Sequence, residues 1–265
     1  MNMYMHELKT YSKITLLWTM TLVLCVALFM SIYPAFTKDV ATFQAMLEGV
    51  PESVRQAIGL EIDQFFSLVG FYSYILLYIK LFGAIQAMNL GLSIISKEVR
   101  DKTADFLLTK PVSRVAILVS KMMAAITCIV FTNVIFIVAT QVILSSVATE
   151  PFHMPTLLLL SLTLFLLQLV FLCIGFLVAV VVQKIKSVLS VSLGIVFMFF
   201  LISLFGSATG DGFLRYFTPF QYVEPAYILK NDSYEWGFLL LGSIIVITSV
   251  VVSYVVYTKK DIPSV

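Results

Sequence analysis

Charged residues are scarce in this chain. Only 12 % of its 265 residues are Asp, Glu, Lys or Arg, whereas 60 % are hydrophobic, and its mean hydropathy is +1.01. A soluble domain of this length could not bury so much apolar surface in one core. The composition therefore excludes a soluble globular protein and predicts an all-α protein embedded in a lipid bilayer.

Residues that could carry out chemistry are equally few. The three cysteines, Cys25, Cys128 and Cys173, fall within apolar runs and form no CxxC pair, so we expect them to act as small packing residues. The two histidines, His6 and His153, fall in segments expected on opposite sides of the membrane, and no carboxylate lies within a predicted span. These absences argue against an intramembrane metal site or acid–base catalysis, and we predict that the chain is not an enzyme.

Six apolar runs approach or exceed the ~20 residues needed to cross ~30 Å of hydrocarbon. We predict one membrane domain over residues 1–265, with spans at about 14–36, 66–95, 113–147, 156–183, 187–206 and 236–258. The first run is longer than a signal-peptide core and no A-x-A site follows it, so we expect a retained span. The third run, roughly 52 Å long at 1.5 Å per residue, should project beyond the hydrocarbon or break.

Lysine and arginine are unequally divided between the two sets of loops. With the N-terminus inside, twelve of them lie on the inner side and four on the outer side, and one, Lys80, lies within a span. Such a bias is typical of the positive-inside arrangement. We therefore predict a multi-pass protein of the bacterial cytoplasmic (inner) membrane, with both termini in the cytoplasm.

The segments outside the spans contain several short helical patterns. Residues 1–13 suit an interfacial helix on the inner side, before the first span. In residues 37–65 apolar residues recur at helical spacing on either side of Gly49-Val50-Pro51, which predicts two small amphipathic helices on the outer surface. The aromatic-rich segment before the last span should contribute amphipathic pieces that dip into the outer interface.

The most polar continuous stretch, "SKEVRDKTADFLLTKPVSR", joins the second and third spans. Its apolar positions recur every three or four residues from Ile95 to Leu107, which predicts a short amphipathic helix over residues 96–110, ended by Pro111. Ser113 can cap the third span. A connector lying on anionic headgroups would explain the charges, but it would not need Phe106, Leu107 and Leu108 beside them.

The second span holds residues that are unusual inside a membrane. Gly83, Ala87 and Gly91 repeat every four residues and would permit close helix contact, within one subunit or between two. Lys80 should either extend toward the outer interface or face a cavity, because a charge at the centre of a span costs ~2.5–3.5 kcal/mol. Gln86 could line a translocation path or hydrogen-bond between helices. The same two roles are open to Asn89, Asn133, Gln141 and Gln168.

The run "ISKEVRDKTADFLLTKPVSRVAILVSKMMAA" resembles the ABC-2 family of ABC-transporter permeases, in its acidic residue after the second span, its "PVSR" and its lysine at the start of the third span. "VPESVRQAIG", "YFTPFQYVEP" and "YTKKDI" are also similar to family features, so the resemblance extends over the whole chain. It implies that the connector is a coupling helix that docks on a separate ATPase subunit. The docking residues would then be Glu98, Arg100, Lys102, Asp105, Phe106 and Leu107.

The chain has no G-x-x-x-x-G-K-[ST] motif, so energy would have to come from a partner. The resemblance implies that ATP and Mg bind to the ATPase subunit, with no cofactor in this chain. It also implies a second permease subunit, identical or different, with membrane lipids around the pair and no nucleic acid. We expect an exporter of a peptide, a lipid or another amphipathic molecule.

Two other functions remain open at this point. The chain could be a non-transporting membrane subunit that uses the same docking helix for signalling or mechanotransmission. A secondary transporter is less well supported. Such proteins usually carry several ionisable groups or broken helices inside the membrane, whereas Lys80 is the one charged residue of this chain that is assigned to neither side of the membrane.

Overall fold

The computed structural model of the chain describes residues 3–38, 40–58, 60, 62–100, 113–148, 151–182 and 185–259. Within these residues the secondary structure is helical and contains no strand. Six helices are long and apolar enough to cross a membrane: α1 (Met3–Lys38), α5 (Leu68–Arg100), α7 (Arg114–Val147), α8 (Met154–Val181), α9 (Val188–Thr209) and α11 (Trp236–Lys259). The predicted all-α architecture with six membrane-spanning helices is confirmed.

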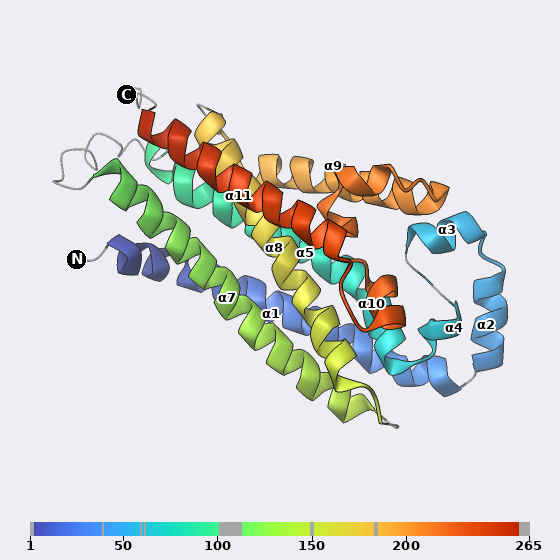
Figure 1. Cartoon of the computed structure of the whole chain (residues 1–265). Helices are drawn as coiled ribbons and strands as arrows, with labels where there is room; N and C mark the ends of the chain where they lie inside the picture. The colour runs from blue at the N-terminus through green and yellow to red at the C-terminus, as the bar shows by residue number, and fades with distance from the viewer. Residues whose placement is uncertain are drawn as a thin grey trace.

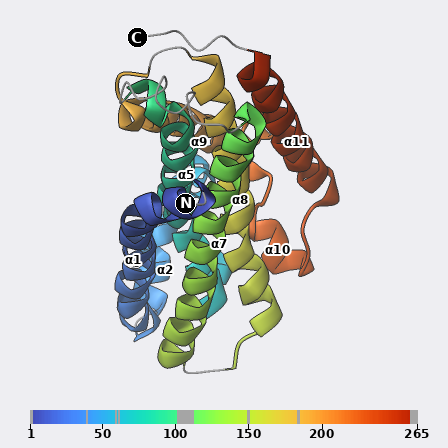
Figure 2. The same cartoon turned by 90° about the vertical axis from the view of Figure 1, so that its left-hand side faces the viewer.

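Helices that follow one another in sequence cross the bundle in opposite directions, so their ends lie at two ends of the bundle (Figure 1). We call the end where α5 finishes and α7 begins the inner end, and the opposite end the outer end. α5 packs most extensively against α8, and α1 against α7. Figure 2 shows α1 and α11 on opposite sides of the bundle, with α7 and α8 between them.

The N-terminal segment differs from the expected arrangement. Residues 3–38 form one continuous helix, so no separate interfacial helix precedes the first span. The reason is local, because no glycine or proline interrupts the sequence before Pro34 and nothing ends the helix near residue 13. α7 is likewise unbroken over 34 residues, which at 1.5 Å per residue makes it roughly 51 Å long, about 20 Å more than the hydrocarbon thickness.

Three short helices, α2 (Val40–Glu48), α3 (Glu52–Ala57) and α4 (Ile62–Phe65), join α1 to α5 at the outer end (Figure 1). α2 and α3 lie where the two small helices were expected, with Gly49-Val50-Pro51 between them; α4 was not predicted. Aromatic rings hold this segment on the bundle, since the Phe36 ring lies 4.8 Å from that of Phe43 and 5.7 Å from that of Phe65.

The chain turns back into the bundle after α9. Gly210 has a φ of 66°, in the left-handed region that glycine adopts most readily. Residues 210–224, which we call the re-entrant segment, then run back along α9 through η1 (Leu214–Phe217) and η2 (Pro219–Gln221). The Thr218 hydroxyl donates to the Phe199 carbonyl (2.8 Å), ten residues before α9 ends and thus roughly 15 Å back along it.

The re-entrant segment therefore lies deeper than the interfacial position expected from its sequence. Its Phe220 ring lies 5.3 Å from that of Phe171 on α8 and 5.4 Å from that of Phe200 on α9, and it is buried in the core cluster. α10 (Pro225–Asn231) then leads to the outer end. Burial of this ring between two helices explains the depth, because it removes more apolar area from water than an interfacial position would.

Candidate functional site

In sequence, the expected docking residues fall at the end of α5, which stops at Arg100, and between it and the start of α7 at Arg114. Lys102, Asp105, Phe106 and Leu107 lie outside the described residues, as do the side chains of Glu98 and Arg100. The start of α7 is as predicted, because the Ser113 hydroxyl accepts from the Ala116 amide (3.2 Å) and caps the helix. The segment between these two helices therefore connects the inner ends of two long continuous helices.

A buried ion pair lies close to those two helix ends. Lys121 on α7 is fully buried and donates to the carbonyl of Ile94 on α5. Its ammonium is 3.9 Å from the carboxylate of Glu7 on α1, which is only 2 % exposed. We call these three residues the inner junction. The sequence placed Lys121 near the inner end, but nothing in its neighbourhood signalled that Glu7 would be buried against it.

Amide side chains form a second buried network at mid-depth. Gln168 on α8 donates to the Gln86 side chain on α5 (3.0 Å) and accepts from Asn133 on α7 (2.6 Å). Gln86 in turn donates to Thr132 (3.0 Å). These amides therefore hydrogen-bond between helices of one chain in this conformation, one of the two roles left open for Gln86. Asn89, three residues further along α5, is half-buried.

The stripe of small residues on α5 faces α8 in the same chain. A methyl group built on Gly83 would lie 2.4 Å from a methyl of Leu164. One built on Gly91 would lie 2.5 Å from the Leu172 carbonyl oxygen and 3.2 Å from the Gly175 Cα. Ala87, between them, is fully buried. The stripe thus permits close packing of α5 on α8, the contact within one subunit that the sequence left as one alternative.

Lys80 is buried rather than extended toward the interface. Only 2 % of it is exposed, and its ammonium donates to the carbonyls of Phe220 (3.1 Å) and Val223 (3.2 Å) in the re-entrant segment. The segment has few backbone hydrogen bonds of its own at this point, so the ammonium satisfies two buried carbonyl oxygens. Lys80 therefore fastens the re-entrant segment to α5.

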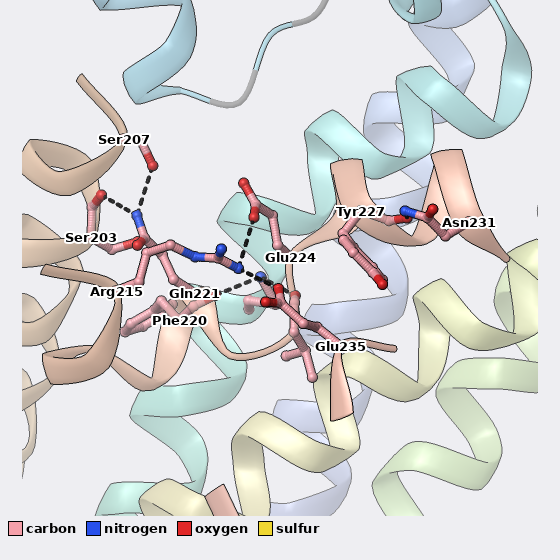
Figure 3. A network of polar contacts seen from close by, with 11 residues as sticks. Ser203, Ser207, Arg215, Phe220, Gln221, Glu224, Tyr227, Asn231 and Glu235 are labelled. Atoms are coloured by element: carbon pink, nitrogen blue, oxygen red, sulfur yellow. Dashed lines mark hydrogen bonds and ion pairs between the residues drawn. The ribbon is translucent and has the colours of Figure 1, made fainter. Parts of the chain in front are cut away.

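Charged and amide side chains fasten the same segment to the neighbouring helices (Figure 3). The Arg215 guanidinium donates to Glu235 (2.8 Å) and lies 3.2 Å from the Glu224 carboxylate. Gln221 donates to the Ser203 carbonyl (2.9 Å) and the Ser207 hydroxyl (2.8 Å) on α9. We call Lys80, Arg215, Gln221, Glu224 and Glu235 the outer clasp. Sequence reasoning missed its members other than Lys80, because their spacing follows no recognisable motif.

A cavity of about 80 Å³ lies beside the outer clasp. Its polar lining includes Lys80, Gln221, Glu224, Ser203, Ser207 and Tyr74. A water molecule needs about 10–15 Å³ on this measure, so the cavity has room for several. Lys80 thus faces a cavity, one of the two alternatives that its sequence position allowed. In the described part of the chain, no three potential metal ligands come together.

Replacing Lys80 by methionine should loosen the re-entrant segment. Lys80→Met keeps a long apolar stem but leaves the Phe220 and Val223 carbonyls without their ammonium donor. Bonds from a charged donor contribute about 1.5–3 kcal/mol each; a local loss of about 2 kcal/mol would raise opening of the segment about thirtyfold. Hydrogen exchange of the amides at 218–224, followed by mass spectrometry, measures this change.

The matched control is Lys230→Met, which removes an exposed lysine from α10, the helix that follows the re-entrant segment. It should leave exchange at 218–224 within about twofold of the unmodified protein, because exposed side chains contribute little to stability. Equal exchange in Lys80→Met and Lys230→Met would show that Lys80 does not fasten the segment.

Comparison with protein families gives evidence independent of these contacts. The model of a family described as "ABC-2 family transporter protein" matches residues 1–262. The match includes all six long helices, both sides of the inner connector and the whole outer clasp. No match is found among curated proteins.

Proposed function

Since the chain belongs to the ABC-2 family of transporter proteins, we propose that it is the permease of an ATP-driven exporter for amphipathic, peptide-like or lipid-like molecules. Family membership makes the chain a multi-pass membrane subunit of an ABC transporter, and the ATPase is a separate subunit. The direction of transport, the class of cargo and the docking residues are the proposed parts.

Helix connectivity at the inner end carries the proposal. α5, of 33 residues, ends on one side of the polar connector, and α7, of 34 residues, begins on the other. Lys121 bonds α7 to α5 about two helical turns from these ends. A displacement of the connector would therefore move both helices together rather than bend one of them. Because α7 is unbroken over roughly 51 Å, motion at its base would reach the outer end.

The proposed orientation has both termini in the cytoplasm of a bacterium, with the chain in the inner membrane. The excess of Lys and Arg in the loops at the inner end supports it. In this orientation the coupling helix proposed at 96–110 meets an ATPase in the cytosol, where ATP and Mg are available. The outer clasp then lies toward the extracytoplasmic side.

We further propose that two permease subunits, identical or different, form the path together. The cavities described in this chain are of about 80 and 310 Å³, and neither crosses the bundle. α1, α9 and α11 each present a row of exposed apolar side chains, among them Leu24, Phe197 and Ile244. Such faces suit contact with lipid or with a second subunit.

Replacing Phe106 by aspartate tests the proposed coupling. Phe106→Asp places a charge where an apolar side chain is proposed to enter the ATPase, so transport per ATP hydrolysed should fall about tenfold or more while the permease remains folded. Measurements in proteoliposomes would use the whole complex, with pull-down of the ATPase, ATPase activity and efflux of fluorescent amphiphiles as readouts.

Met46→Asp is the control, because Met46 is an exposed apolar residue of α2 at the opposite end of the bundle. It should leave coupling unchanged. Normal pull-down and transport by Phe106→Asp would refute the docking role. An intact complex that hydrolyses ATP but moves no amphiphile, with the unmodified chain, would favour the signalling function over export.

A further inference from the structure

An apolar cavity of about 310 Å³ lies between α8, the re-entrant segment and α11. Its lining includes Val170 on α8, Pro219 and Tyr222 in the re-entrant segment, and Phe238 and Gly242 on α11. The two hydroxyl groups in the lining are already used, since Tyr222 donates to the Tyr216 carbonyl and Ser243 to the Leu239 carbonyl. The cavity therefore offers apolar surface and no unused hydroxyl donor.

The size of the cavity suits a substantial apolar group. It has about twice the volume of an engineered apolar cavity of ~150 Å³ that binds benzene, and it reaches the ~300–1,000 Å³ range of small-molecule sites. Along α11 the lining extends from Phe238 to Ile247, roughly 14 Å at 1.5 Å per residue. The space is thus elongated along the membrane-spanning direction, in the outer half of α11.

The cavity persists because its outer wall is fixed. Tyr222 and Phe238 stack with ring centroids 5.9 Å apart, and the Arg215 guanidinium lies 4.3 Å from the centroid of the Phe238 ring. Arg215 is in turn held by Glu224 and Glu235. The outer clasp therefore holds the start of α11 against the re-entrant segment and fixes the position of both walls at the outer end of the cavity.

Glycine at position 242 keeps the middle of the cavity open. A methyl group built there would make only ordinary contacts, 3.6 Å from a Tyr222 ring carbon and 3.8 Å from a Val170 methyl. A larger side chain would extend into the space. On the outward side the lining meets the membrane surface, since Ile247 is 62 % exposed.

We propose that this cavity binds one acyl chain of a phospholipid from the outer leaflet of the surrounding bilayer. An unfilled cavity would forfeit dispersion contacts along its walls, and water entering it would find few hydrogen-bond partners. Hydrocarbon is the medium that surrounds α11, and a chain entering past Ile247 would lie parallel to the helix. The choice of leaflet rests on the proposed orientation, whereas the acyl-chain site does not depend on export.

Filling the cavity tests the proposal. Gly242→Leu should lower the amount of phospholipid that remains bound to the detergent-purified chain about tenfold, as measured by native mass spectrometry. Gly242→Ala should retain the lipid, because its methyl group fits without close contacts. Gly237→Leu is the matched control on the same helix, since Gly237 does not line the cavity and a Cβ there would meet no atom within 4 Å.

A second measurement works on the unmodified protein, in case Gly242→Leu fails to fold. In nanodiscs, a phospholipid with a photoreactive acyl chain should label residues 166–170 and 238–247 in preference to the exposed faces of α1 and α9. Labelling spread evenly over the exposed helices, or full lipid retention by folded Gly242→Leu, would overturn the site. Both assays use the isolated chain, so a failure of export in the coupling experiment would not affect them.

Discussion

Gly91→Ala is expected to destabilise the protein by about 3 kcal/mol or to prevent its folding, although it adds one methyl group. The new Cβ would lie 2.5 Å from the Leu172 carbonyl oxygen and 3.2 Å from the Gly175 Cα. Both neighbours are backbone atoms of α8, so no side chain can rotate away to make room. α5 and α8 would have to separate along their whole contact, which is the largest between helices in the described chain.

Two other glycines provide graded controls for this effect. Gly83→Ala would meet the end of the Leu164 side chain at 2.4 Å, which can move, so its cost should be smaller, about 1 kcal/mol. Gly194→Ala on α9 would meet no atom within 4 Å and should be neutral or slightly stabilising, by about 0.5 kcal/mol. Unfolding in detergent as SDS is added measures all three. Equal stability of Gly91→Ala and Gly194→Ala would show that α5 and α8 do not meet as described.

The spans were predictable because they depend on local composition. Twenty or more consecutive apolar residues have no stable place except a bilayer or a large core, and Pro51 and Ser113 marked helix starts through their own backbone and side-chain chemistry. The separate N-terminal helix was not found, since the polar character of residues 3–13 affects where a helix lies but does not interrupt it.

The depth of the re-entrant segment could not be predicted in the same way. Its aromatic composition suits the membrane interface, and only the fold shows that Phe220 finds a place between α8 and α9. Gly210 allows the reversal, but a glycine alone does not say where the chain goes afterwards. Contacts between residues far apart in sequence determine that position, and composition carries no signal for them.

In the candidate site, too, some residues stood out in the sequence, whereas their contact partners are known only from the structure. Lys80 and Gln86 stood out as polar residues in an apolar span, so their importance was visible from the sequence. The bonding partners of Lys80 are 140 and 143 residues away, and no spacing rule connects them. Gly83 and Gly91 predicted a close helix contact, but the identity of the opposing helix comes from the packing of α5 on α8.

Lys121→Met is expected to cost about 3–5 kcal/mol, because it leaves the Glu7 carboxylate buried without its cation. Glu7 is 2 % exposed, and within the described residues its second carboxylate oxygen already lacks a hydrogen-bond partner. The Ile94 carbonyl would lose its donor as well. Lys186→Met, an exposed change on the same side, should cost less than about 0.5 kcal/mol.

A double-mutant cycle separates the ion pair from other effects of removing Lys121. Glu7→Gln removes the buried negative charge, so the double variant Glu7→Gln/Lys121→Met should regain about 2 kcal/mol relative to Lys121→Met alone. The free energy of unfolding in detergent is measured for four proteins: the unmodified chain, the two single variants and the double variant. Additive losses would mean that Glu7 and Lys121 stabilise the protein independently and that the 3.9 Å approach contributes nothing.

The same four proteins also test whether the inner junction makes α5 and α7 move together during transport. Lys121 joins α7 to α5 a few turns from the connector, so a folded variant lacking this bond would let one helix move without the other. Transport per ATP hydrolysed should then fall about tenfold in Lys121→Met. It should remain low in the double variant even where stability is regained, because the Glu7→Gln change restores charge balance but not the bond to Ile94. Recovery of transport in parallel with stability would instead show that the junction only holds the fold together.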